Sequence, residues 1–108
     1  MTQRNTQDLF RLLAVHRLGT RFLSGRPGSA DLQEGLARVL VSETAGDENK
    51  KIAFFYLSLA SPKLTPHSRR AIVEYASDPA HGDVVAQKGS ARAALTANLL
   101  EVIKKMGE

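Results

Sequence analysis

The apolar residues of this chain recur with the 3.6-residue period of an α-helix, and no segment keeps the strict alternation of a half-buried strand. Five segments carry the helical period, and stretches rich in Gly, Pro and Asp separate them. We predict helices over 6–24, 29–44, 48–60, 66–77 and 91–106. The pattern therefore predicts an all-α fold, a compact bundle of about five to six short helices, with 78–89 as either a loop or a short helix.

The segment 52–60, Ile-Ala-Phe-Phe-Tyr-Leu-Ser-Leu-Ala, is the most apolar part of the chain. Its aromatic and β-branched residues would also suit a short buried strand. A lone strand, however, has no neighbour to pair its backbone N–H and C=O groups, and no second strand is predicted elsewhere. We therefore expect this segment to form the central helix of the bundle.

Local signals mark where several of these helices begin. Thr65 followed by Pro66 is the strongest, with Thr as the N-cap and Pro at the first helical position. Ser29 and Ser90 are the predicted N-caps of two further helices. The residues on the apolar stripes are expected to be buried: Leu36, Phe55, Leu59, Ile72, Val73, Ala76, Leu95, Leu99, Val102, Ile103 and Met106.

The length of 108 residues suits one domain, and it allows a core to be buried without the help of a metal or a disulfide. We expect a single helical domain over 1–108, with 1–5 flexible. Cysteine is absent, which excludes disulfides and thiolate chemistry. The polar N-terminus is unlike a targeting segment, and no run approaches the ~20 apolar residues that span a bilayer. These features predict a cytoplasmic protein with no membrane role, in the host cell if the chain is viral.

Histidine is the residue on which most catalytic hypotheses for this chain depend, and there are only three. His16 falls on the apolar face of the first helix, where the expected role is that of a hydrogen-bonded core histidine. His67 lies in the first turn of a helix and is expected to be exposed. Asp78, His81 and Asp83 would offer ligands to a metal, but helix caps and a turn explain them more simply.

Motifs of nucleophilic catalysis and of phosphate binding are missing as well. No serine stands in a Gly-x-Ser-x-Gly elbow, and the Gly-rich stretch 24–29 lacks the Gly-Lys-Ser/Thr of a phosphate loop. A phosphate would at most rest on Arg26 and the first turn of the second helix. The sequence therefore predicts that the protein is not an enzyme and uses no metal or cofactor.

A basic arc on the first helix points most directly to a function. Its arginines lie opposite the apolar face, and two apolar side chains interrupt them. The arc consists of Arg4, Arg11, Arg17 and Arg21 together with Phe10 and Leu18. Arginine beside an exposed aromatic ring is typical of single-stranded nucleic-acid binding, where the guanidinium meets phosphate and the ring stacks on a base. The same mixture is typical of protein-binding hot spots, and the structural alternative is that Phe10 and Leu18 pack beneath a neighbouring helix.

A second basic group surrounds the start of the helix at 66–77 and consists of Lys63, His67, Arg69 and Arg70. The net charge of +4 is compatible with an anionic partner. We therefore expect a non-catalytic accessory module of a nucleic-acid process, which contacts RNA or DNA through a basic face. The alternative is a protein–protein adaptor or self-associating helical domain without a nucleic-acid role, for which the Ala-rich last helix would supply a close contact.

Overall fold

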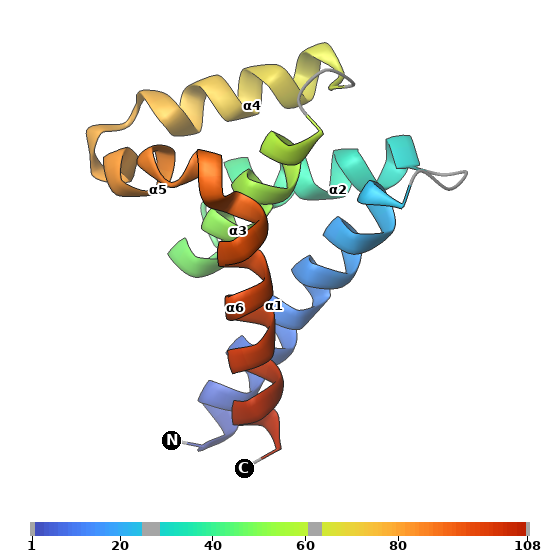
Figure 1. The fold of residues 1–108 in the computed structure, drawn as a ribbon, viewed down its shortest axis with the longest axis vertical. Helices are drawn as coiled ribbons and strands as arrows, with labels where there is room; N and C mark the ends of the chain where they lie inside the picture. The colour runs from blue at the N-terminus through green and yellow to red at the C-terminus, as the bar shows by residue number, and fades with distance from the viewer. Residues whose placement is uncertain (1, 25–28, 61–63, 108) are drawn as a thin grey trace.

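The computed structural model describes residues 2–24, 29–60 and 64–107, apart from the side chains of 2–6 and 29, and its regular elements are all helical (Figure 1). The α-helices are α1 (Thr2–Leu23), α2 (Ser29–Val41), α3 (Asp47–Leu59), α4 (Pro66–Ser77), α5 (Gly82–Ala86) and α6 (Ala91–Met106). Two short 3₁₀ turns, η2 (Pro79–His81) and η3 (Lys88–Ser90), flank α5. The predicted all-α fold is confirmed.

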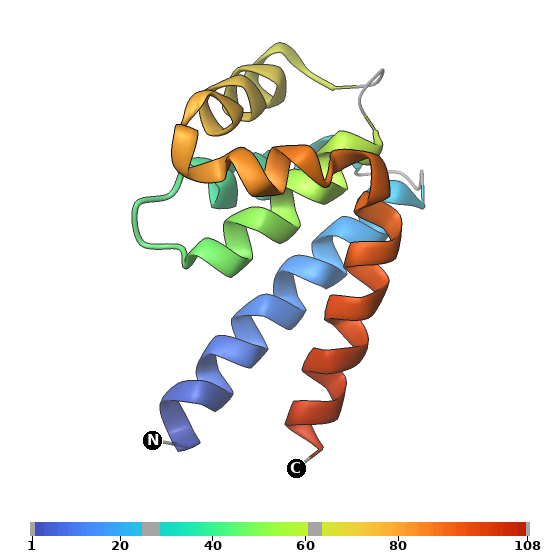
Figure 2. The ribbon, with the colours of Figure 1, turned by 60° about the vertical axis from the view of Figure 1, so that its left-hand side comes forward.

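Helix α3 is the central element of the bundle, as predicted. It packs against α1, α2, α4 and α6. In Figures 1 and 2, α4 lies across α2 and α3 at the top, while α1 and α6 run downward as a crossing pair. The two ends of the chain therefore lie at the same end of the molecule, far from α4.

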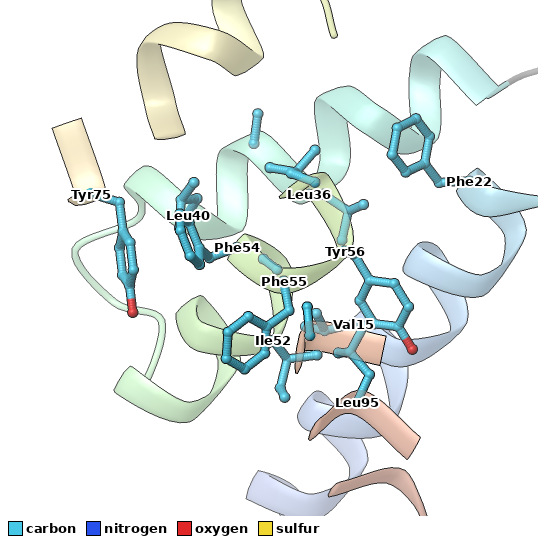
Figure 3. Packing of buried hydrophobic residues seen from close by; sticks show 14 of the residues in the cluster. Val15, Phe22, Leu36, Leu40, Ile52, Phe54, Phe55, Tyr56, Tyr75 and Leu95 are labelled. Atoms are coloured by element: carbon cyan, nitrogen blue, oxygen red, sulfur yellow. The ribbon is translucent and has the colours of Figure 1, made fainter. Parts of the chain in front are cut away.

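The core gathers around the aromatic residues of α3 (Figure 3). Every side chain from Ile52 to Leu57 is buried, and the ring centroid of Phe54 lies 5.0 Å from that of Tyr75 in α4. Four of the predicted core residues are buried, namely Leu36, Phe55, Leu95 and Val102. Four others are half-buried at the edge of the core, namely Leu59, Ile72, Leu99 and Met106.

Three residues predicted to be buried are exposed instead: Val73 (62% exposed), Ala76 and Ile103 (53% exposed). Helix α4 packs on α2 and α3 with one narrow face, which consists of Ser68, Ala71 and Tyr75. Val73 follows Ala71 by two residues, which turns it about 200° away from that face. Ile103 similarly lies beyond the face that α6 packs on α1 and α3. The prediction was wrong because the apolar pattern is wider than the covered face.

The helix boundaries follow the predicted caps only in part. The Thr65 hydroxyl oxygen accepts a hydrogen bond from the Ser68 amide at 3.2 Å, and Pro66 is the first residue of α4, as predicted. Ser90 lies at the N-cap position of α6, as predicted, but its side chain makes no capping bond. Its hydroxyl donates to the Gln87 carbonyl at 3.1 Å instead, because the turn of η3 leads directly into the helix. The side chain of Ser29, the other predicted cap, lies outside the described residues.

Two boundaries differ from the predicted ones by more than one residue. Helix α1 begins at Thr2, four residues before the predicted start. Helix α2 ends at Val41 because the hydroxyl of Ser42 accepts hydrogen bonds from the amides of Thr44 and Ala45, both at 3.2 Å. These side-chain contacts replace the backbone bonds that would continue the helix.

The segment 78–89, left open by the sequence, is mostly helical. Asp78 caps η2, its carboxylate accepting from the Ala80 amide at 2.9 Å. The His81 ring stacks on the Tyr75 ring with centroids 3.8 Å apart, and its Nδ1–H donates to the Tyr75 carbonyl at 2.8 Å. Asp83 lies in the first turn of α5 without being its N-cap, so only the first of the two predicted caps is confirmed. No helix in the described ranges is both long and apolar enough to cross a membrane.

Candidate functional site

Three residues of the predicted basic arc share the solvent side of α1. Phe10, Arg17 and Arg21 are all exposed, and their spacings of seven and four residues place them along one face of the helix. The Phe10 ring is 55% exposed. Neither Arg17 nor Arg21 forms an ion pair with another described residue. We call this surface the outer face of α1.

The other described members of the arc lie elsewhere. Arg11 lies beside a groove on a different side of α1, with one guanidinium nitrogen 3.9 Å from the Asp8 carboxylate. Leu18 is half-buried, and its methyl groups lie 3.6 and 3.8 Å from where a Cβ on Gly35 of α2 would stand. Leu18 therefore packs beneath a neighbouring helix, as the structural alternative predicted, whereas Phe10 does not.

The second basic group is separate from the first. Arg69 and Arg70 are exposed on α4, which lies at the opposite end of the molecule from the start of α1 (Figure 1). His67 is exposed, as predicted, and its Nδ1 lies 3.0 Å from the Glu34 carboxylate of α2. Arg26 and Lys63 lie outside the described residues, as does the side chain of Arg4. The predicted basic residues that lie in the described ranges therefore do not form one surface.

A chain of hydrogen bonds runs from the core to the surface through His16, Tyr56 and Asn98. The Asn98 carbonyl oxygen accepts at 2.7 Å from Nε2 of His16, which must therefore carry the proton. Nδ1 of the neutral ring then accepts from the Tyr56 hydroxyl at 2.8 Å. The Asn98 amide donates in turn to the Glu48 carboxylate at 2.6 Å. His16 is thus the hydrogen-bonded core histidine that the sequence predicted, and it links α1 to α3 and α6.

Burial favours the neutral forms of both rings in this hydrogen-bond chain, the imidazole of His16 and the phenol of Tyr56. Burial lowers the pKa of His16, an effect that the hydrogen bond with Asn98 and the charge of Glu48 partly offset. Burial also raises the pKa of Tyr56 to about 12. His16 is only 1% exposed, so it contacts no solvent-borne molecule in this conformation. The arrangement suits a structural link between helices rather than acid–base chemistry on a substrate.

A groove of about 950 Å³ lies between the middle of α1, the end of α2 with the α2–α3 connection, the start of α3 and the second half of α6. Apolar side chains lining it include Leu9, Leu12, Val15, Leu18, Val39 and Val102. Its charged lining residues are Asp8, Arg11, Arg38, Asp47, Glu48, Glu101 and Lys105. Asn98 and Glu48 both line the groove, so the hydrogen-bond chain from His16 reaches the groove surface. Sequence reasoning missed this groove because four separate segments build it.

A metal site at Asp78, His81 and Asp83 was the alternative function that the sequence offered for this segment. Within the described ranges, no three His, Asp or Glu side chains come together in a way that would hold a metal ion. Asp78 and His81 are occupied as described above, one as a cap and the other stacked on Tyr75. This arrangement favours the interpretation of the Asp78–Asp83 cluster as caps and a turn.

Comparison of the chain with protein-family models, with curated proteins and with solved structures gave no match. These comparisons therefore assign neither a family nor an activity, and the surfaces of the chain itself carry the functional inference.

Proposed function

We propose that the chain is a non-catalytic helical binding module, an accessory factor of a nucleic-acid process that contacts single-stranded RNA or DNA through the outer face of α1. The observation that carries the proposal is the exposed ring of Phe10 on the same face as Arg17 and Arg21. An exposed ring offers a base a stacking partner, and a guanidinium without an acidic neighbour is available to a phosphate.

The size of this face sets the expected strength of binding. Arg21 follows Phe10 by eleven positions, which corresponds to about 17 Å along the helix axis. At 3.4 Å for each stacked nucleotide, the face covers about five nucleotides. We therefore expect weak, sequence-tolerant binding, supported by the net charge of +4. The module would act in the cytoplasm, or in a host cell if the chain is viral.

A specific observation favours the second candidate, a self-associating or adaptor domain. Leu100 is 63% exposed and Ile103 also lies in solvent, while Ala93 and Ala97 are exposed on the same helix. Exposed apolar residues next to small ones allow a second helix to approach closely. In this alternative the basic charge of α1 has no role in recognition.

Fluorescence anisotropy with a labelled single-stranded oligonucleotide tests the first candidate. Phe10→Ala is expected to weaken binding by about 1–3 kcal/mol through the loss of stacking. Val73→Ala is the matched control, because it truncates another exposed apolar side chain on α4, away from the outer face. Absence of binding to the unchanged protein even at ~50 mM salt, where phosphate contacts are strong, would reject the proposal in favour of the adaptor.

A further inference from the structure

We propose that the groove between α1, α3 and α6 receives an amphipathic helix of a partner protein, and that a basic side chain of this helix binds the Glu48 carboxylate. Phe10, Arg17 and Arg21 do not line the groove. The inference therefore goes beyond oligonucleotide binding and does not depend on it.

The lining of the groove favours a helix over a small molecule. Its volume of about 950 Å³ is at the upper end of the range for small-molecule pockets, about 300–1,000 Å³. Such pockets are mostly apolar and aromatic, whereas this groove has seven charged lining residues and, among the described residues, no aromatic one. An apolar floor between charged edges is the surface that receives the apolar face of an amphipathic helix.

The charged lining residues differ in sign between the helices that carry them. Those of α3 and α6 are Asp47, Glu48 and Glu101 against a single Lys105. Those of α1 and α2 are Arg11 and Arg38 against Asp8, and Arg38 is also paired with Glu34 at 3.6 Å. A complementary partner helix therefore has basic residues along the edge of its apolar face that meets α3 and α6.

The side chain of Glu48 is fixed by two contacts within the protein. Its carboxylate accepts a hydrogen bond from the Asn98 amide at 2.6 Å and lies 3.1 Å from the Lys51 ammonium. The buried His16 in turn donates a hydrogen bond to Asn98. The side chain is nevertheless about half exposed (48%). A carboxylate offers about four acceptor positions, so two of them are open to an incoming Lys or Arg. A carboxylate that is already immobilised loses little side-chain entropy on binding.

The experiment is a selection from a displayed library of helical peptides on the immobilised protein, followed by affinity measurements on the enriched peptides. We expect enriched sequences to share an i, i+4, i+7 apolar pattern with Lys or Arg along one edge. Glu48→Gln is expected to weaken their binding about tenfold, whereas Glu74→Gln, on exposed α4, leaves it unchanged. Failure to enrich any peptide, or enrichment without the basic edge, would overturn the proposal.

A second variant separates the groove from the rest of the surface. Gly46 is exposed, lines the groove and has open space where a Cβ would stand, so Gly46→Trp is expected to block peptide binding without disturbing the core. Ala93→Trp places the same ring on an exposed position of α6 outside the groove and is expected to bind normally. If Gly46→Trp abolishes oligonucleotide binding and leaves peptide binding intact, the groove binds nucleic acid and the proposal is wrong. If Phe10→Ala abolishes oligonucleotide binding alone, the two surfaces are independent, as proposed.

Discussion

The phenol ring of Tyr56 occupies the space that a side chain on Gly19 would need. A Cβ built on Gly19 would overlap ring atoms of Tyr56, so a glycine at this position lets α1 approach α3 closely. The same ring donates its hydroxyl to His16, which lies one turn earlier on the same side of α1. Close helix contact and the buried hydrogen-bond chain therefore depend on each other.

Gly19→Ala is expected to destabilise the protein by about 1–3 kcal/mol, because the added methyl overpacks a well-filled core. This loss outweighs the gain of up to ~1 kcal/mol that alanine brings to a helix interior. Gly35→Ala is the matched control on α2. Its Cβ would meet Leu18 only at ordinary contact distances of 3.6 Å or more, so this variant is expected to be neutral or more stable. Urea denaturation measures both, and a Gly19→Ala protein as stable as Gly35→Ala would contradict the close contact.

Phe55→Ala tests whether α3 is the centre of the core. Phe55 is 1% exposed, and its truncation is expected to cost about 3–5 kcal/mol in unfolding free energy through lost burial and a cavity. Phe10→Ala removes the same ring from an exposed position and is expected to change stability by less than ~1 kcal/mol. Equal losses for the two variants, measured by thermal or urea unfolding, would show that the burial described for α3 is wrong.

The helices were predictable from the sequence because their signals are local. Apolar periodicity and the Thr65–Pro66 cap are each contained in short stretches of the chain, and only the choice of helix over strand for 52–60 needed the rest of the sequence. Burial was less predictable, since it depends on how much of each helix a neighbour covers. Val73 is apolar and yet exposed, while Ser68 is fully buried with its hydroxyl bonded to that of Thr65.

Only those parts of the candidate sites that lie on a single helix were predictable from the sequence. The common face of Phe10, Arg17 and Arg21 follows from helical spacing alone. His16 was predicted to find a hydrogen-bond partner, but its partners lie 40 and 82 residues away, and no local pattern identifies them. The groove depends in the same way on how four segments meet.

Stability should fall on the acidic side of neutrality because of His16. Its pKa is lowered from 6.5 in the folded protein by burial, so below about pH 6.5 the unfolded chain binds the proton more readily. The stability that His16 contributes is therefore complete above this pH and is lost as the pH falls toward the folded pKa. The slope from this one group is at most about 1.4 kcal/mol per pH unit.

His16→Gln is expected to flatten this pH dependence, because an amide offers a donor and an acceptor but does not titrate. His67→Gln, which removes an exposed histidine of α4, is expected to keep it. Urea midpoints compared between about pH 7.5 and about pH 5 measure the effect. Identical pH profiles for the His16→Gln variant and the unchanged protein would mean that the pKa shift of His16 does not set the pH dependence of stability.

Salt dependence distinguishes the outer face of α1 from the groove side of the same helix. If Arg17 and Arg21 each contact one phosphate, the logarithm of affinity should fall against the logarithm of salt concentration with a slope of about −1.4, since each contact on a single strand contributes about −0.7. Arg17→Ala is expected to halve this slope. Arg11→Ala removes the same charge from the groove side, beside Asp8, and is expected to leave the slope unchanged. Should Arg11→Ala reduce the slope while Arg17→Ala leaves it unchanged, the nucleic acid would lie across the groove rather than along Phe10, and the outer face would not be the binding surface.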